Sequence, residues 1–364
     1  MKLVFLGLSF SSSWGNGHAT TYRALIKGLH QLGHEVTFLE RDVPWYAQHR
    51  DVASSSFCRL EFYRSLSELV QRHRPAIAAA DAVVVGSYVP EGVAVIRLVR
   101  EIANGVVAFY DIDTPVTLAR LAGGGDEHLV PALVPTFDVY LSFTSGPSLE
   151  RLEREFGARK AVALHCMVDA ELYRPAQVPI RYDLGYLGTY SADRQPALER
   201  LLIEPARQLP SRRFVVAGAQ YPRDMKWPAN VEHVEHVAPV DHPHFYGSMR
   251  FTLNVTRADM VAAGHSPSVR LFEAAACGTP LISDRWAGLD RFFPESSAIF
   301  VADRSEDVIR ALTELDDEQI GAMAEKARAI TLARHTGRSR ASTLEAEIAA
   351  QISRMQRRRL ARTA

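Results

Sequence analysis

Short, mostly apolar runs alternate with amphipathic helical segments along this chain, and this alternation constrains the fold more than any other feature. In segment 21–32, for example, apolar residues recur every three or four positions, as along one face of a helix. Predicted strands in the first half occupy residues 3–8, 35–40, 82–85, 106–110, 139–143 and 161–164. Continuous apolar strands that alternate with helices are typical of a parallel sheet covered on both faces.

The same alternation starts again in the second half, at residues 184–187, 214–217, 251–255, 281–283 and 299–301. Two prolines between the halves indicate a linker, and 364 residues suit two domains of about 150 residues each. We therefore predict an α/β chain with two doubly wound, Rossmann-like domains. The predicted parts are an N-terminal domain (1–168), a linker (169–180), a C-terminal domain (181–335) and a C-terminal helix (336–364).

The C-terminal helix is predicted from Leu344, Ile348, Ile352 and Met355, which recur every three or four residues before an arginine-rich end. Such a helix can pack along the N-terminal domain with a solvated basic end. A peripheral contact with an anionic membrane is the alternative interpretation.

The composition excludes several classes of function. Lys plus Arg and Asp plus Glu both number 42, so the chain lacks the basic excess of a dedicated nucleic-acid binder. No apolar run approaches the length of a transmembrane helix, and the apolar N-terminus lacks a cleavage site and is predicted to be a buried strand. Three cysteines without CxxC spacing predict reduced thiols and a cytoplasmic location.

Residues 15–20 (GNGHAT) superficially match a dinucleotide-binding loop, with Glu40 at the place of its ribose-binding acid. However, Thr20 stands where the third glycine is needed, and about six residues separate the first strand from Gly15. We interpret the loop instead as an acceptor-side loop that lets backbone approach a ligand. Its residues are Gly15, Asn16 and Gly17.

Segment 263–293 contains the strongest local signal. Ser266 suits a helix N-cap and Pro267 the first helical position, which predicts a helix that ends near Cys277. Arg270 in the first turn would then form an anion site, and Glu273 one turn later could accept two hydrogen bonds from a cis-diol. Diphosphate followed by ribose is the order of groups in a nucleotide sugar. The alternative is a capped core helix with a surface Arg–Glu pair.

This segment resembles the donor-site signature of GT-B glycosyltransferases, in the form of the CgeB-like family and the related glycosyltransferase family 4. The resemblance implies that Glu273 holds the donor ribose, whereas the sugar-contacting acid of family 4 falls on His265. The CgeB-like pattern G-x-S-P-x-x-R-x-F-E is matched by Gly264, Ser266, Pro267, Arg270, Phe272 and Glu273.

Weaker matches extend the resemblance to other parts of the chain. Segment 168–175 (VDAELYRP) is similar to an interdomain N-G-V-D-x-x-x-F-x-P segment. Segments 187–194 and 216–218 resemble two glycine loops of the family. The implied donor-binding residues are Gly188, Thr189, Tyr190, Arg194, Gly218, His265, Ser266, Ser268, Val269, Arg270 and Glu273. The resemblance also implies two domains that face each other across a cleft, with the last helix crossing back onto the first domain.

The implied activity is a metal-independent hexosyltransferase. Its donor would be a UDP-, GDP- or TDP-type sugar, no cofactor would be needed, and Arg194 and Arg270 would offset the charge of the leaving diphosphate. A histidine-rich stretch at 233–244 matches no standard zinc spacing. The acceptor, whether small molecule, glycan or protein, the stereochemistry and the oligomeric state stay open.

Three residues are candidate catalytic bases. Asp111 and Asp113 follow an apolar strand, where they could activate an acceptor hydroxyl or simply cap the next helix. His18 stands at or next to a helix N-terminus and could act as a base or as a cap. Two alternatives to a transferase remain: a GT-B-fold sugar-nucleotide epimerase, and a catalytically silent protein that binds nucleotide sugars.

Overall fold

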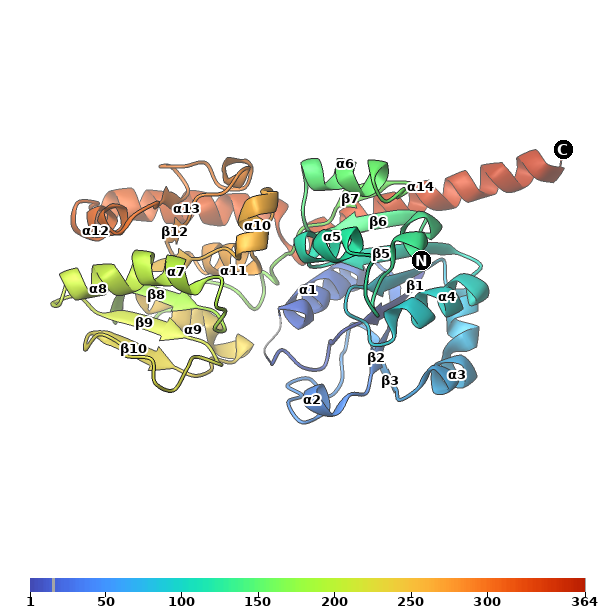
Figure 1. Cartoon of the computed structure of the whole chain (residues 1–364), viewed down its shortest axis with the longest axis horizontal. Coiled ribbons are helices and arrows are strands. Elements are labelled where there is room, and N and C mark those ends of the chain that lie inside the picture. The colour runs from blue at the N-terminus through green and yellow to red at the C-terminus, as the bar shows by residue number, and fades with distance from the viewer. Residues whose placement is uncertain (15–16, 364) are drawn as a thin grey trace. The chain divides into compact units, whose positions relative to one another are not determined.

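The computed structural model describes residues 1–14 and 17–363, and it divides into two compact units (Figure 1). Unit 1 comprises Met1–Cys166 and the C-terminal segment from Gly337, whereas unit 2 comprises Met167–Thr336. Each unit is built on one parallel sheet with connecting helices, which confirms the predicted α/β class with two doubly wound sheets.

The sheet of unit 1 has the strand order β3-β2-β1-β4-β5-β6-β7. Its strands are β1 (Lys2–Gly7), β2 (Glu35–Arg41), β3 (Arg59–Tyr63), β4 (Ala82–Gly86), β5 (Val106–Asp111), β6 (Val139–Ser142) and β7 (Ala161–Ala163). Its helices are α1 (His18–Gln31), α2 (Pro44–Ala47), α3 (Leu66–Ala79), α4 (Gly92–Ile102), α5 (Thr114–Ala122), the 3-10 helix η1 (Pro131–Thr136), α6 (Pro147–Arg154) and α14 (Gly337–Thr363).

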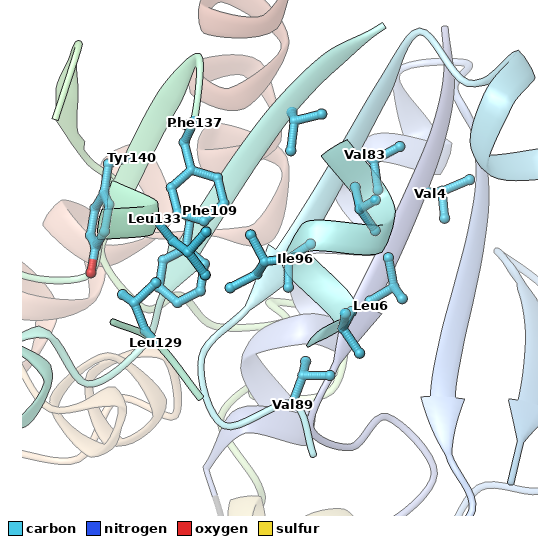
Figure 2. Packing of buried hydrophobic residues seen from close by; sticks show 14 of the residues in the cluster. Val4, Leu6, Val83, Val89, Ile96, Phe109, Leu129, Leu133, Phe137 and Tyr140 are labelled. Carbon is cyan, nitrogen blue, oxygen red and sulfur yellow. The ribbon is translucent and has the colours of Figure 1, made fainter. Parts of the chain in front are cut away.

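Alternate residues of each strand in unit 1 point to opposite faces of the sheet, and both faces are buried. Val4 and Leu6 of β1 belong to the core under α3 and α4, which Figure 2 shows from close by. Phe5, between them, points to the other face, where its ring meets Tyr22 of α1 edge-on at 6.4 Å. Burial on both sides explains why the predicted strands are continuously apolar.

Helices α1 and α14 pack so closely that two glycines are needed where they meet. A Cβ atom on Gly28 would lie 2.4 Å from the carbonyl oxygen of Gly337, and one on Gly337 would lie 2.0 Å from that of Ala24. Further along α14, Leu344 and Ile348 are fully buried. The C-terminal helix thus completes the fold of unit 1.

The end of α14 is different, because its side chains leave the body of unit 1. Arg354, Arg357 and Arg358 are exposed, and Leu360 is 70% exposed. None of the helices in the described part of the chain is both long and apolar enough to cross a membrane.

The sheet of unit 2 has the order β10-β9-β8-β11-β12-β13. Its strands are β8 (Tyr182–Leu187), β9 (Phe214–Ala217), β10 (Val231–Val234), β11 (Met249–Asn254), β12 (Leu281–Ser283) and β13 (Phe300–Val301). Its helical segments are α7 (Gln195–Leu198), the π-helix η2 (Glu199–Ile203), α8 (Glu204–Gln208), η3 (Pro239–Asp241), α9 (His242–Gly247), α10 (Ala258–Ala263), α11 (Val269–Ala276), η4 (Leu289–Arg291), α12 (Ser305–Thr313) and α13 (Asp317–Arg334).

Two details differ from the pattern expected from the sequence. Helix α1 begins at His18, earlier than its apolar periodicity, because the first turn carries small and polar residues. Strand β3 is absent from the prediction because it is a half-buried edge strand whose sequence, RLEFY, contains two charged residues. None of the three cysteines, Cys58, Cys166 and Cys277, forms a disulfide within the described residues.

Candidate functional site

In unit 2 the chain order of the sheet reverses at β8, which pairs with β9 on one side and with β11 on the other. In doubly wound parallel sheets, ligands bind at the carboxyl ends of the strands beside such a reversal, because the loops on either side diverge. The predicted donor-site residues from segments 187–194 and 216–218 and from the start of α11 meet at this edge.

Arg270 lies in the first turn of α11 and spans the two strand ends. Its Nε donates to the carbonyl oxygen of Leu187, the last residue of β8. Its Nη1 donates to Oδ1 of Asn254, the last residue of β11, at 3.3 Å. The guanidinium also lies 4.9 Å from the ring centre of Tyr186, a cation–π contact. These contacts hold a cation in one place at the strand ends.

Arg194 supplies a second cation at the same edge. Its Nη2 donates to the carbonyl oxygen of Thr189 at 2.5 Å, whereas its Nε is buried and has no hydrogen-bond partner among the described residues. Burial lowers the pKa of Arg194, and the nearby charge of Arg270 lowers it further. Within the described residues neither guanidinium forms an ion pair, so the two together favour an anionic ligand.

Two glycines let the loops after β8 and β9 lie directly against each other. The Gly188 N–H donates to the carbonyl oxygen of Ala217 at 2.7 Å, and a Cβ on Gly218 would lie only 2.0 Å from the Gly188 oxygen. The Tyr190 N–H donates to the carbonyl oxygen of Ala219 at 2.9 Å. This contact joins the two predicted glycine loops into one platform of backbone next to the two arginines.

An aromatic group borders this platform. The Tyr221 hydroxyl donates to the carbonyl oxygen of Gly188 at 3.2 Å, and the Tyr221 ring meets those of Tyr190 and His233. His233 in turn stacks on Trp227 with ring centres 5.2 Å apart. The histidine-rich stretch therefore contributes an aromatic wall at the carboxyl ends of β9 and β10.

The start of α11 differs from the prediction that Ser266 caps the helix. The helix begins at Val269, with Ser268 at the N-cap position, and the buried Ser266 hydroxyl donates to the carbonyl oxygen of Gly264 at 2.7 Å. The reason is a left-handed turn at Gly264 and His265, with φ of 63° and 49°, which delays the helix. The His265 N–H is meanwhile held by the carbonyl oxygen of Ala287 at 2.6 Å.

Glu273 is buried, whereas the alternative of a surface Arg–Glu pair requires an exposed side chain. Only 4% of it is exposed, and no ion pair joins it to Arg270 in the described residues. Instead it faces Tyr173, Tyr246 and Cys277. Burial raises the pKa of the Tyr173 hydroxyl and of the Cys277 thiol, and the negative charge of Glu273 raises both further. Glu273 is thus a buried carboxylate that forms no ion pair with a described arginine or lysine, and its charge also acts on His242.

In unit 1 the predicted acids follow β5, and Asp111 is fully occupied. Its carboxylate accepts from the Tyr140 hydroxyl at 2.7 Å, the Thr117 hydroxyl at 2.9 Å and the Asp113 N–H at 3.1 Å. Burial raises the pKa of Asp111 to about 6, although these three hydrogen bonds lower it. Asp111 therefore ties the start of α5 to β6.

Asp113 is more accessible and sits at the N-cap position of α5 without a side-chain capping bond. It accepts a hydrogen bond from the Tyr88 hydroxyl at 2.9 Å, and the Tyr88 ring meets the His18 ring at 5.7 Å. Burial lowers the pKa of His18 to about 4, so its imidazole is neutral at pH 7. His18 and Asp113 are thus brought near one tyrosine, which the sequence analysis did not single out.

The loop before α1 is only partly within the described residues. Gly17 is exposed and stands at the N-cap of α1, so His18 does not cap the helix, whereas Gly15 and Asn16 lie outside the described residues. Glu40, which mimics a ribose-binding acid in the sequence, instead accepts the N–H groups of Phe10 at 2.6 Å and Ser11 at 2.8 Å. Glu40 is therefore used to hold the loop after β1.

No cluster of three or more metal-ligating His, Cys, Asp or Glu side chains occurs in the part of the chain that the structure describes. The predicted metal independence stays a prediction. Tyr190 was among the predicted residues, whereas Tyr88 of unit 1 and Tyr186, Tyr221 and Asn254 of unit 2 were not predicted. For Asn254 a signal existed, because it is a polar residue directly at the carboxyl end of an apolar strand.

Comparisons with known proteins agree with this geometry. Residues 194–346 match the glycosyl transferase-like family. The fold resembles sucrose-phosphate synthase from Thermosynechococcus elongatus, with 15% identity, a TM-score of 0.65 and coverage of 99% of both chains. It also resembles HepE from Anabaena in complex with UDP-glucose, with 14% identity, a TM-score of 0.68 and coverage of 97% of this chain and 99% of that chain.

A third similar structure is an α-glucosyltransferase in complex with UDP-glucose and DNA containing an abasic site. It shares 15% identity and a TM-score of 0.69, over 92% of this chain and 95% of that chain. A search of curated proteins by sequence finds no match. The chain has the GT-B fold, and its residues 194–346 match the glycosyl transferase-like family.

Proposed function

We propose that this protein transfers a sugar from a nucleotide-diphosphate sugar, with UDP as the nucleotide to test first, to a hydroxyl acceptor without a metal ion. The observation that carries the proposal is the pair of cations Arg194 and Arg270 at the strand ends of unit 2, which form no ion pair with described residues. Similar structures that contain UDP-glucose, HepE and an α-glucosyltransferase, support UDP as the first choice.

In the proposed reaction the bond between the anomeric carbon and the diphosphate oxygen breaks, and negative charge develops on the leaving diphosphate. Arg194 and Arg270 stabilise that charge from fixed positions, which lowers the barrier because little reorganisation is needed. The backbone of Gly188 and Gly218 lets the diphosphate approach closely. Glu273 accepts hydrogen bonds from the ribose hydroxyls.

His18 and Asp113 of unit 1 are our candidates for the group that receives the acceptor's proton. We favour them over Asp111, because three hydrogen bonds already occupy that carboxylate. His18 is neutral at pH 7 and can therefore accept a proton. A CgeB-like subfamily, a cytoplasmic location and membrane contact through the exposed arginines of α14 remain part of the proposal.

The test is a thermal-shift screen of UDP-, GDP-, TDP- and ADP-sugars with EDTA, repeated with Mg²⁺ in place of EDTA. A ligand at 100 times its dissociation constant stabilises the fold by about 2.7 kcal/mol. We expect stabilisation by one nucleotide class that does not depend on Mg²⁺. A requirement for Mg²⁺ contradicts the metal-free mechanism, and no stabilisation by any nucleotide contradicts the assigned donor site.

Turnover is then followed by mass spectrometry with the nucleotide sugar that binds, in the presence of a panel of small-molecule and glycan acceptors. Transfer increases the mass of an acceptor by one sugar and supports the proposal. A donor product of unchanged mass but altered configuration would instead identify an epimerase. Binding without any turnover or hydrolysis would identify a silent binding protein.

A further inference from the structure

Two hydrogen bonds between a tyrosine and an aspartate occur at the carboxyl end of β5 in unit 1. The Tyr140 hydroxyl donates to Asp111 at 2.7 Å, and the Tyr88 hydroxyl donates to Asp113 at 2.9 Å. Asp111 is fully buried and accepts two further hydrogen bonds, so its pair belongs to the fold. Asp113 and Tyr88 are only half-buried, so solvent and a ligand can reach the second pair.

The backbone of Tyr88 has a strained conformation. Its φ of 62° lies in the left-handed region, which residues with a Cβ atom rarely adopt. Both neighbours are fixed by the fold: the Ser87 N–H donates to the carbonyl oxygen of Tyr110 at 2.9 Å, and Val89 is buried in the core shown in Figure 2. Glycine would adopt this conformation without strain. A tyrosine kept at such a position is typical of a functional site.

Three side chains hold the Tyr88 ring in place. The rings of His18 and His128 meet it edge-on, with ring centres 5.7 Å and 5.3 Å away. The Arg120 guanidinium lies 5.1 Å from the ring centre and is itself ion-paired with Asp126 at 2.7 Å. These contacts restrict the ring and, with it, the position of the hydroxyl group.

The protonation states favour Asp113 over His18 as the group that takes a proton. Burial raises the pKa of the Tyr88 hydroxyl and the charge of Asp113 raises it further, so Tyr88 keeps its proton and donates. Burial lowers the pKa of His18 to about 4, because a protonated imidazole would add a charge to a buried place. A carboxylate instead loses its charge when it takes a proton. The other titratable or charged groups around this pair are Asp111, Arg120 and His128.

We propose that Asp113 is the catalytic base for the acceptor hydroxyl and that Tyr88 is the positioning residue that orients its carboxylate. This inference rests on the proposed transfer function and narrows its two candidate bases to one. As the acceptor oxygen bonds to the anomeric carbon, its proton passes to Asp113. The bond from that carbon to the diphosphate oxygen breaks, and its electron pair leaves with the diphosphate. Tyr88 keeps its own proton throughout, and Asp113 afterwards releases the acceptor's proton to water.

The main test needs no identified acceptor, because water can take the place of the acceptor hydroxyl. It measures the release of UDP from UDP-glucose by the full chain. Asp113→Asn should lower kcat at least about 100-fold, the size of a lost general base. Tyr88→Phe should lower kcat about 10-fold, the size of one lost hydrogen bond to a charged group, and leave KM unchanged. In an Asp113→Asn background, Tyr88→Phe should have no further effect.

The possible outcomes separate this inference from the proposed function. If Asp113→Asn reduces turnover but Tyr88→Phe does not, or if the two losses multiply in the double variant, only the positioning role of Tyr88 is wrong. Wild-type turnover of the Asp113→Asn variant would overturn the assignment of the base. A wild-type chain that releases no UDP, with water or with any acceptor of the mass-spectrometry panel, would overturn the transfer function itself.

Tyr140→Phe is the matched control, because it removes the other Tyr–Asp hydrogen bond at the end of β5. It should lower the melting temperature but leave kcat and KM of the folded protein unchanged. Equal losses of turnover in Tyr140→Phe and Tyr88→Phe would indicate a general disturbance of this strand end, and they would contradict a specific role for Tyr88.

The pH profile of kcat/KM provides a readout that a purely structural role would not change. A hydrogen bond to a carboxylate favours its charged form, so the acid limb of the profile should move to higher pH in Tyr88→Phe. It should stay in place in Tyr140→Phe. An acid limb that does not move in Tyr88→Phe, or that moves only in Tyr140→Phe, would show that Tyr88 does not act through the catalytic base.

Discussion

The two units use the same winding of a parallel sheet but differ in the charged groups at the carboxyl ends of their strands. In unit 1 the buried groups there are the carboxylates of Glu40 and Asp111, and each accepts at least three hydrogen bonds from its own unit. Unit 2 has one such carboxylate, Asp284 after β12, but it also carries the half-buried guanidiniums of Arg194 and Arg270. One nitrogen of Arg194 is buried and unpartnered among the described residues.

This difference distinguishes charged groups that stabilise the fold from charged groups that are available to bind a ligand. A buried ionised group is costly unless its surroundings compensate it, so a satisfied carboxylate contributes to the fold of its own unit. The charge of Arg270 lowers the pKa of Arg194, whereas the nearby Asp193 acts in the opposite direction, and neither arginine forms an ion pair with a described residue. Such an arrangement is typical of a binding site, where a ligand supplies the missing charge.

The largest effect is expected from the arginines of unit 2. Arg270→Ala and Arg194→Ala should each raise the barrier to sugar transfer by about 2–4 kcal/mol, or about 30- to 1000-fold in kcat, as for a lost oxyanion donor. Their melting temperatures should stay near that of the wild type. The measurement is steady-state turnover with the nucleotide sugar that binds.

Arg207→Ala is the control for these two variants, because Arg207 forms an exposed ion pair with Glu199 on the same unit. It should have wild-type turnover. If the Arg270 and Arg194 variants lose stability but keep their turnover per folded molecule, then the cations of unit 2 are structural like the carboxylates of unit 1.

Glu40 should show the opposite behaviour. Glu40→Ala leaves two buried backbone N–H groups without an acceptor and should lower the free energy of unfolding of unit 1 by about 3 kcal/mol. Glu40→Gln should cost less, about 1 kcal/mol, because one amide oxygen can still accept from both N–H groups. Urea unfolding provides the measurement.

Donor affinity supplies the second half of the Glu40 comparison. In both Glu40 variants, the folded protein should bind the nucleotide sugar with unchanged affinity, since Glu40 hydrogen-bonds only within unit 1. A loss of donor affinity in the folded Glu40→Gln variant would show that Glu40 of unit 1 also affects donor binding.

A further effect concerns the pH dependence of stability at Asp111. Its pKa of about 6 in the folded protein lies above the ordinary value of 3.8, so its protonated form stabilises the fold. This contribution is complete below pH 4 and is lost as the pH rises through 6. Asparagine does not titrate, so Asp111→Asn should cost more at pH 4 than at pH 7, by about 2–3 kcal/mol.

The contribution of His18 changes the stability of the fold with pH in the opposite direction, and the same experiment must take it into account. Its pKa of about 4 in the folded protein lies below the ordinary value of 6.5, so its contribution is present above pH 6.5 and is lost as the pH falls through 4. The Asp111 effect is therefore taken as the difference between variant and wild type, because His18 is common to both. A difference that does not change with pH would contradict the buried state of Asp111.

Local sequence patterns predicted most of the fold, because a strand buried on both faces leaves an unbroken apolar run. The edge strand β3 was missed for the same reason: Arg59 and Glu61 interrupt the run where burial is incomplete. The donor-site arginines were predicted from their spacing and from the family resemblance. The cap at Ser266 was wrong, because the left-handed turn at Gly264 and His265 depends on contacts with residues 287 and 288.

The sequence by itself determined the α/β class, the two doubly wound sheets and the segments that carry glycines and arginines, since these depend on neighbours within a few residues. Only the tertiary structure decided what each charged side chain does. Glu40 and Glu273 are both buried carboxylates, yet one accepts backbone N–H groups and the other faces a tyrosine. Those partners come from distant parts of the chain, and the free energy of a buried charge depends on which partners the fold brings to it.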